Sequence, residues 1–253
     1  MRSATTVYDE LLLHQAEASF PLEQVLFAGE PWRSAHTVLD VGCGNGEYTR
    51  RLAEQYPDKH FLGLEPDEEM YALAQRFGYL PNLNILPGSL DDLPDDFEAD
   101  ILFARLVLIH VADPVKDPEK MAHWARDHTM GSIIVNPADD LAYLWPTIPG
   151  LAEILAENRG RIEPFTGRPD MGPVTTEAWK AAGHAQVFSR DVVLSTTSPG
   201  PSGRMLQLML LNAELNYGSP LPGDLYRILH EWSAARDSYA QYGLRGLGFQ
   251  VLG

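Results

Sequence analysis

Short apolar runs alternate with segments of helical periodicity through the middle of the chain. The apolar runs predict buried strands at residues 38–46, 61–65, 83–90, 100–104 and 132–137. The ranges 38–46 and 83–90 each include the turn that follows the strand. The segments between them predict helices at about 47–56, from 66 onward and at 119–128, with a short helix after the fourth strand. A crossover helix at about 175–182 and strands at 185–196 and 247–252 follow. This alternation predicts one α/β domain with parallel strands.

The two ends of this pattern carry segments of a different kind. Residues 1–37 predict a helical lead-in, with one helix from about Tyr8 to Gln15 and a second from near Ser19 to Gly29. We expect such a lead-in to cover a binding site at the edge of the sheet.

The segments 138–173 and 198–243 predict insertions into the α/β pattern. The first is too apolar for a solvated loop, although prolines and glycine interrupt any long helix. The second contains the run Met205–Leu211, which is apolar on nearly every side, and a later amphipathic helix. The apolar run must be buried against the core, across a pocket or in a homodimer.

A glycine-rich turn follows the first predicted strand and contains the most informative motif of the chain. Its residues Asp40, Gly42, Gly44 and Gly46 form the pattern Asp-x-Gly-x-Gly-x-Gly immediately before a helix. Glycines there let the backbone approach a ligand closely, and we expect free backbone N–H groups at the helix start. Neither register completes the dinucleotide pattern Gly-x-Gly-x-x-Gly, and no Lys-Ser or Lys-Thr pair completes a P-loop.

A second acid stands at the end of the next predicted strand. Glu65 comes 19 residues after Gly46, where a doubly wound fold places a carboxylate against ribose hydroxyls. The two motifs together predict a nucleoside site. The acid at Asp40 suits a ligand with an ammonium group and would repel a pyrophosphate.

These motifs resemble the first two motifs of the class I S-adenosylmethionine (SAM) dependent methyltransferases. The stretch 99–114, which contains Leu108, His110 and the pair Asp113-Pro114, resembles the ubiquinone-biosynthesis-like small-molecule methyltransferases. The resemblance implies a doubly wound, mostly parallel seven-stranded sheet of the Rossmann-like methyltransferase fold, with its last two strands in a hairpin. It also implies one methyltransferase domain over residues 1–253, with the SAM-binding core at 38–137.

The resemblance also implies the parts of the site. SAM is the expected cofactor and S-adenosylhomocysteine the product. In the family pattern an acid near the third strand accepts from the adenine amino group, and Ser89 stands in its place here. The implied cofactor-binding residues are Asp40, Gly42, Cys43, Gly44, Asn45, Gly46, Glu65, Pro66, Ser89, Leu90 and Arg105.

Two polar residues after the fourth strand have alternative roles. Arg105 lies at the carboxyl end of that strand, where it meets the carboxylate of SAM or pairs with a nearby acid. His110 is the candidate general base because its pKa lies near working pH, and the alternative is a structural imidazole that holds the loop.

The expected substrate contacts come from the lead-in and the insertions. They are Tyr8, His14, Tyr143, Trp145 and Met209. For Tyr8 and His14 the alternative is ordinary packing or surface exposure, and for Met209 it is core packing.

Composition narrows the partners. The formal net charge of −16 argues against a polyanionic partner such as nucleic acid or an anionic membrane, and favours a neutral or cationic substrate. The segment 136–139 also lacks the second proline and the aromatic residue of the amino-group DNA methyltransferase motif.

The single cysteine, Cys43, excludes an intrachain disulfide and a multi-cysteine metal site, and we expect no metal. The sequence has no apolar run of membrane-spanning length and no hydrophobic signal core, which predicts a cytoplasmic protein.

The predicted function is SAM-dependent transfer of a methyl group to an O, N or C atom of a small, partly apolar molecule, for example in secondary metabolism. Two alternatives remain. The chain could bind SAM without transferring its methyl group, as a non-methylating catalyst or a sensor, or it could be a nicotinamide-dependent enzyme.

Overall fold

A computed structural model describes residues 2–145, 171–196, 203–217, 223–235 and 238–252. Within these residues, eight strands form one sheet in the order β3-β2-β1-β4-β5-β8, and both β6 and β7 pair with β8. The strands are β1 (Thr37–Val41), β2 (His60–Glu65), β3 (Leu83–Pro87), β4 (Ile101–Arg105), β5 (Gly131–Pro137), β6 (Tyr143–Trp145), β7 (His184–Ser195) and β8 (Tyr239–Val251).

The helices flank this sheet. They are α1 (Ala4–Glu23), α2 (Glu47–Gln55), α3 (Glu68–Ala74), α4 (Lys116–His128), α6 (Gly172–Ala181), α7 (Gly203–Tyr217) and α8 (Gly223–Ala234). Short 3-10 turns are η1 (Gln24–Phe27), η2 (Gln75–Phe77), η3 (Leu90–Asp92) and η4 (Asp139–Leu141).

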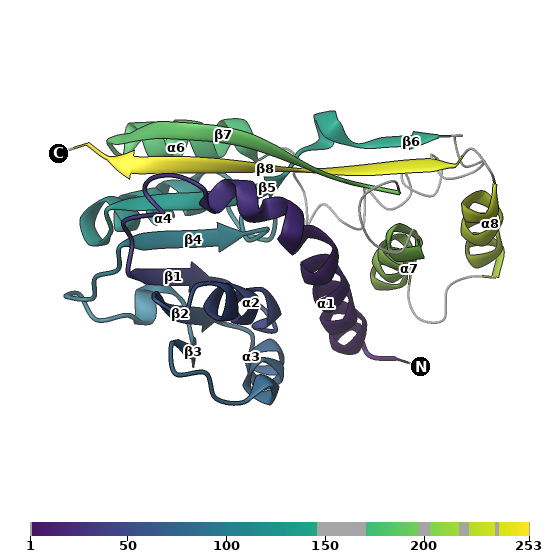
Figure 1. Cartoon of the computed structure of the whole chain (residues 1–253), viewed down its shortest axis with the longest axis horizontal. Helices are drawn as coiled ribbons and strands as arrows, with labels where there is room; N and C mark the ends of the chain where they lie inside the picture. Colours follow the sequence, from purple (N-terminus) through teal and green to yellow (C-terminus); the bar gives the residue numbers. More distant parts are fainter. Residues whose placement is uncertain (1, 146–170, 197–202, 218–222, 236–237, 253) are drawn as a thin grey trace.

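The predicted doubly wound, mostly parallel sheet is confirmed. Strands β1 to β5 are parallel, whereas β8 runs antiparallel to β5 and forms the predicted hairpin with β7. The short strand β6 is an addition, because it pairs with the beginning of β8 at the end far from the core (Figure 1). Three residues are too few to show an alternating pattern, so the sequence did not predict this strand.

Alternate side chains of the strands are buried in two layers. Along β4, Leu102 packs on one face of the sheet with α4 and α6, while Phe103 packs on the other with α2 and η1. Both side chains are wholly buried. Burying one such side chain contributes about 1.5–3 kcal/mol, so these layers hold the sheet rigid beneath the ends of its strands.

A third apolar cluster lies away from the sheet layers. It joins α1, α7, α8 and the far ends of β7 and β8. In Figure 1, β7 and β8 extend past the parallel strands toward α7 and α8, and α1 crosses between the two parts. These elements therefore lie beyond the carboxyl ends of the parallel strands (Figure 1).

The lead-in is one continuous helix, so the predicted break near Ser19 was wrong. The Ser19 hydroxyl donates to the carbonyl of Gln15 within the helix and therefore does not cap a new one. Pro21 lies within the last turn of α1, where its missing N–H removes one i→i−4 hydrogen bond close to the end of the helix.

The predicted short helix after β4 was also wrong, since residues 106–115 form turns. The backbone N–H of Leu106 donates to Val135, and its φ of 60° is left-handed. This turn interrupts the helical path. The N-cap of the next helix is Val115, two residues after the predicted Asp113, whose carboxylate accepts from the N–H groups of Val115 and Lys116.

Strand β8 begins at Tyr239 and not near 247, so the last residues of the predicted insertion 198–243 belong to the sheet. The glycines of β8 hid this strand from sequence analysis, because glycine is rare in strand interiors. A Cβ atom at Gly243 would stand 2.8 Å from the carbonyl oxygen of Ala138, and one at Gly246 would stand 2.4 Å from Leu26. The glycines therefore let neighbouring segments pack directly against β8.

Candidate functional site

A cavity of about 1260 Å³ opens at the carboxyl ends of β1, β2 and β4. One side is formed by residues 42–45 of the glycine turn and by residues 65–67, and the opposite side by α7 and α8. Helix α1 covers it along its length, and β8 contributes residues 240–244. The lead-in expected to cover a site at this edge does so.

The glycine turn can form only with glycine at its tightest points. Gly42 has φ of 68°, and a Cβ atom there would stand 2.8 Å from the Val107 side chain. Gly46, the N-cap of α2, has φ of 75°, and its Cβ would stand 2.7 Å from Ile85. Left-handed backbone costs other residues about 1–2 kcal/mol even without these clashes.

The N–H groups of residues 42–44 in this turn are not free. Gly42 and Cys43 both donate to the carbonyl of Leu64, at 2.8 and 3.0 Å, and Gly44 donates to the Glu65 carboxylate at 2.7 Å. These donors tie the turn to β2. The turn therefore offers close approach to a ligand, while the adjoining side chains supply the polar contacts.

Glu65 is held in place at the edge of the cavity. One carboxylate oxygen accepts from Gly44 and the other from the backbone N–H of Asp67 at 2.9 Å. Burial raises the pKa of this carboxyl above its ordinary value, although the two hydrogen bonds oppose that shift. Each oxygen retains a lone pair for a further donor.

Asp40 lies at the base of the same site and is almost wholly buried. Its carboxylate accepts a hydrogen bond from the Thr49 hydroxyl at 2.5 Å. Burial raises the pKa of Asp40 to about 7, and the Thr49 hydrogen bond and the charge of Arg105 offset only part of this effect. A cationic ligand group would favour its ionised form.

Arg105 pairs with an acid that the sequence did not single out. Its Nε and Nη2 donate to the Glu23 carboxylate at 2.9–3.2 Å, and Nη2 also donates to Ser19 at 2.9 Å. The Tyr48 hydroxyl donates to Glu23 at 2.5 Å, and the guanidinium stands over the Tyr48 ring. Within the described part of the chain, Nη1 of Arg105 has no protein partner, and Arg105 lines the cavity.

This pair is buried and stays charged. Burial by itself raises the pKa of Glu23, but the charge and hydrogen bonds of Arg105 hold it below its usual value. The pKa of Arg105 is correspondingly raised, because Glu23 outweighs the opposing effect of burial. The pair joins the end of α1 to the end of β4.

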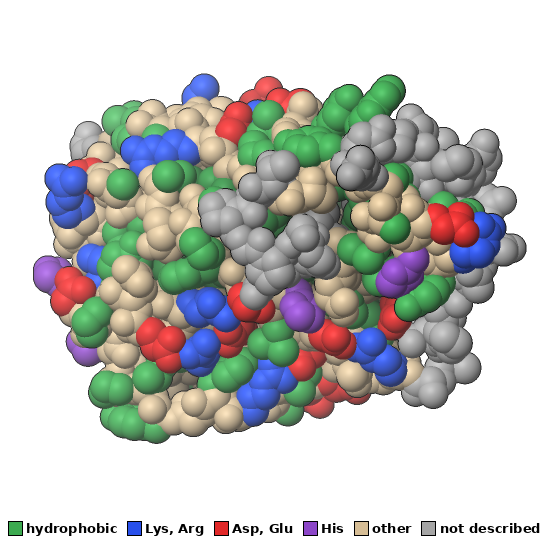
Figure 2. Space-filling model, turned by 45° about the vertical axis from the view of Figure 1, so that its right-hand side comes forward, with side chains coloured by type: hydrophobic (Ala, Val, Ile, Leu, Met, Phe, Trp, Pro, Cys, Tyr) green, Lys and Arg blue, Asp and Glu red, His purple; other side chains and the backbone are tan. Residues whose placement is uncertain are grey.

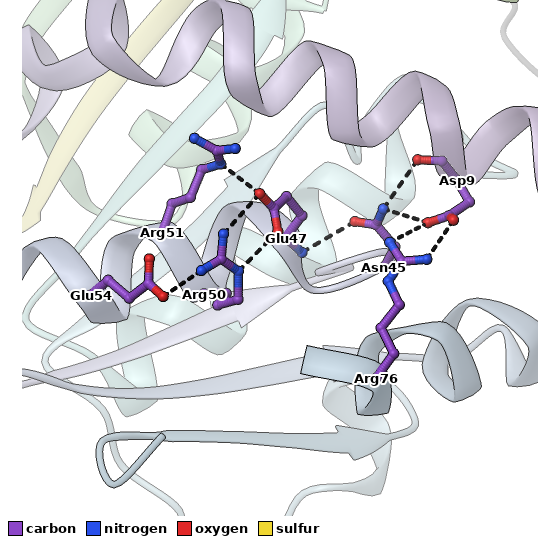
Figure 3. A network of polar contacts seen from close by, with 7 residues as sticks. All are labelled: Asp9, Asn45, Glu47, Arg50, Arg51, Glu54 and Arg76. Atoms are coloured by element: carbon purple, nitrogen blue, oxygen red, sulfur yellow. Dashed lines mark hydrogen bonds and ion pairs between the residues drawn. The ribbon is translucent and has the colours of Figure 1, made fainter. Parts of the chain in front are cut away.

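A second network fixes α1 over the glycine turn (Figure 3). The Asn45 side chain donates to Asp9 of α1 at 2.7 Å, and Asp9 also forms an ion pair with Arg76 of η2. The side-chain oxygen of Asn45 accepts a hydrogen bond from the backbone N–H of Glu47 at 3.2 Å. Asn45 therefore links the cover of the cavity to the start of α2.

His110 lies in the turn after β4 and lines the cavity with its side chain exposed. Its ring stands edge-on to the ring of Tyr8, with 6.3 Å between the centroids. Tyr8 comes from α1, so two polar aromatic side chains from distant segments meet at the cavity.

The structure brings together most of the residues that the sequence proposed. Asp40, Gly42, Cys43, Gly44, Asn45, Glu65, Pro66, Arg105, His110, Tyr8, Tyr143 and Met209 line one cavity. Gly46, Ser89, Leu90, His14 and Trp145 are not among its described lining residues.

Those five residues have other contacts or positions. Ser89 bonds Asp92 through both its N–H and its hydroxyl, and Leu90 packs against the core. His14 stands 3.9 Å from Glu10 along α1, and Trp145 is half-exposed at the end of β6. The adenine contact at Ser89 and Leu90 therefore stays a prediction.

Several residues of the site were not predicted from the sequence, including Glu23, Tyr48, Asp67 and Tyr242. Asp67 looked like a helix cap, which it also is. Glu23 and Tyr48 are separated by 25 residues and become neighbours only in the fold. Tyr242 lay in a predicted insertion and carried no recognisable motif.

Across the described ranges, no group of three or more His, Cys, Asp or Glu residues could hold a metal ion. The helices of that same part include none that is both long and apolar enough to cross a membrane.

Residues 38–128 match the family described as "Methyltransferase domain". Trans-aconitate 2-methyltransferase of Deinococcus radiodurans is 36% identical over 83 residues, which are 33% of this chain and 31% of that protein. The tRNA U34 carboxymethyltransferase of Syntrophotalea carbinolica is 34% identical over 112 residues, 42% of this chain and 34% of its own length. The chain thus spans about a third of the length of these relatives.

Solved structures share the fold over most of the chain. YcgJ from Bacillus subtilis has a TM-score of 0.55 and 18% sequence identity, covering 92% of this chain and 99% of its own. At that identity the likeness concerns the fold alone.

Proposed function

On the premise that this chain carries a class I methyltransferase domain of the SAM-dependent type, we propose that it transfers the methyl group of SAM to an O, N or C atom of a small, partly apolar molecule. The observation that carries the proposal is the meeting of Asp40, Glu65 and the glycine turn in one cavity. Two carboxylates beside a tight glycine turn suit a nucleoside with an ammonium group and a ribose.

The residues present fit SAM. Asp40 would hold its ammonium group, Nη1 of Arg105 its carboxylate, and Glu65 the two ribose hydroxyls. A Cβ atom at Gly42 would clash with Val107, which lines the same cavity. When bound, SAM would supply an activated methyl group, and the electrons of the bond from carbon to sulfur would remain on sulfur as the acceptor atom takes the methyl.

The protein's own part is alignment and exclusion of water. The cavity walls position the acceptor in line with the methyl group, and α1 covers the site. An acceptor that loses a proton as it attacks also needs a base. His110 lines the cavity and carries an imidazole that can take this proton.

One relative is named for tRNA, but the charge of this chain disfavours such a substrate. Its formal net charge is −16, and phosphate binding depends on clustered Lys and Arg. On the face shown in Figure 2, acidic and basic side chains of the described residues are interspersed and form no basic patch. The expected homodimer and cytoplasmic location stay predictions.

A thermal-shift comparison tests the cofactor. SAM and S-adenosylhomocysteine are expected to raise the melting temperature, whereas NAD is not. Stabilisation by NAD alone would reject the proposal in favour of a nicotinamide enzyme. Mass spectrometry then separates transfer from binding without transfer, because transfer adds one CH₂ unit to the acceptor and releases S-adenosylhomocysteine.

The pKa of Asp40 makes SAM binding depend on pH. Below about pH 7 this carboxyl is protonated and must lose its proton to hold an ammonium group. The Kd for SAM, measured by calorimetry, should therefore rise about tenfold for each pH unit below 7 and stay level just above it. Asp40→Asn should bind weakly at pH 8 with no such slope. An unchanged slope in that variant would assign the titration to another group.

The role of His110 is tested by His110→Ala. If the imidazole takes the acceptor's proton, turnover should fall about 100-fold while SAM affinity is unchanged. His60→Ala removes an exposed imidazole at the other end of β2 and serves as control. Near-normal turnover in His110→Ala would indicate a structural role.

A further inference from the structure

The part of the cavity lined by α7, α8 and the far end of β7 has mostly apolar walls, and Asn212 is the polar residue among the described lining residues of these elements. We call this part the acceptor half and define it by Leu11 of α1, Leu194 of β7, Leu208 and Met209 of α7, and Leu225 and Leu229 of α8. Small-molecule sites usually measure about 300–1,000 Å³, and this cavity of about 1260 Å³ exceeds that range. It therefore has room for a second apolar molecule beside a nucleoside.

The charged side chains that line the cavity lie around Asp40 and Glu65. We call this part of the cavity the cofactor half. Among the described lining residues, the acids are Asp40, Glu65 and Asp67, and the guanidinium is that of Arg105. Arg105 is already paired with Glu23, and the proposed function gives its remaining N–H groups to the carboxylate of SAM. No lysine or second arginine of the described residues lines the acceptor half, so an anionic acceptor would enter without a counter-charge.

Tyr242 marks the junction of the two halves. Its side chain packs against both the sheet cluster and the cluster of α7 and α8, and it interacts electrostatically with Arg105 and Glu23. It lines the cavity from β8, while Tyr8 lines it from α1. Tyr8 likewise packs against the α7–α8 cluster and interacts with Glu65 and Arg105.

The hydroxyls of both tyrosines have no hydrogen-bond partner among the described residues. Burial raises the pKa of Tyr242 to about 12, so this phenol stays protonated at neutral pH. It can therefore donate a hydrogen bond, and leaving such a donor unsatisfied in a closed site is costly.

We propose that the acceptor is an uncharged, apolar molecule that presents an oxygen atom at the junction, where Tyr242 donates a hydrogen bond to it and Tyr8 offers a second donor. This inference rests on the proposed function. It makes Tyr242 a residue that selects and orients the acceptor, and it excludes carboxylates and phosphates as acceptors.

Matched ten-carbon probes test the charge preference. Decan-1-ol, decanoate and decylammonium are titrated below their aggregation limits into protein saturated with S-adenosylhomocysteine, and also into protein without it. Decan-1-ol should bind about tenfold or more tightly than decanoate and more tightly than decylammonium. Decanoate binding as tightly as decan-1-ol, or no binding of decan-1-ol, overturns the inference.

Tyr242→Phe tests the hydrogen bond. It should weaken decan-1-ol binding about three- to tenfold. Tyr226→Phe, on the exposed side of α8, is the control and should have no effect. Equal binding of decan-1-ol by wild type and Tyr242→Phe overturns the assignment of this residue.

A charge placed in the acceptor half gives an independent measurement. Met209→Lys should reverse the preference toward decanoate, while Met209→Gln, of similar length and no charge, should not. An unchanged preference in Met209→Lys counts against an acceptor bound in this half. Binding of S-adenosylhomocysteine is measured in a separate titration. If S-adenosylhomocysteine does not bind, the proposed function is rejected instead.

Discussion

Glu65→Ala is expected to weaken SAM binding by about 30- to 1,000-fold, the largest loss of affinity among the changes considered. The carboxylate is fixed by the N–H groups of Gly44 and Asp67 at the edge of the cavity. Hydrogen bonds to a charged group contribute about 1.5–3 kcal/mol each, and the proposed ribose contact has two. Loss of both, partly compensated by water, corresponds to about 2–4 kcal/mol.

Calorimetry with S-adenosylhomocysteine measures this effect without need of an acceptor. Glu65→Gln keeps one acceptor oxygen and should lose less affinity. Glu68→Ala, an exposed acid three residues later on α3, is the matched control. Wild-type affinity in Glu65→Ala would refute the assigned ribose contact.

Glu23→Ala is expected to cause the largest loss of stability. It would leave Arg105 as a buried cation without its ion-pair partner, and it would also remove the acceptor of the Tyr48 hydroxyl. Breaking a buried ion pair from one side costs about 3–5 kcal/mol. For a chain of this size the melting temperature should fall by about 10 °C.

Two controls distinguish the loss of the Glu23–Arg105 ion pair from a general weakening of α1. Glu10→Ala removes an exposed acid of the same helix and should cost less than about 1 kcal/mol. The double change Glu23→Leu with Arg105→Met should recover much of the stability, because no unpaired charge remains. A loss below about 1 kcal/mol in Glu23→Ala would contradict the strength assigned to the pair.

The stability that Glu23 contributes also depends on pH. Its pKa in the folded protein is below the ordinary value of 4.5, so the folded state favours the ionised form. The contribution is therefore complete above about pH 4.5 and is lost as pH falls through the lowered folded value. The difference in unfolding free energy between wild type and Glu23→Ala should narrow in that acid range.

The parallel half of the fold was accessible from sequence because its determinants are local. Each buried strand is an apolar run, and each is followed by a turn or helix with its own capping residues. The Asp40 to Gly46 turn was recognisable because only glycine tolerates its backbone. The end of β2 at Glu65 follows from the same reasoning.

Errors arose where a local pattern met a distant partner. The glycines of β8 argued against a strand, but they are required by the close packing of Leu26 and Ala138 on that strand. The helix predicted after β4 gave way to a turn at Leu106, which places Val107 against Gly42. Neither contact could be inferred from neighbours in the chain.

The sequence by itself determined that this protein has a doubly wound sheet with an acid-flanked glycine turn and a carboxylate after the second strand, because those features depend on residues close together along the chain. Only the tertiary structure decided that Arg105 is held by Glu23, that the turn's N–H groups are bound to β2, and that Tyr242 faces the cavity. These arrangements join segments tens of residues apart, and packing and burial select them rather than any local preference of the chain.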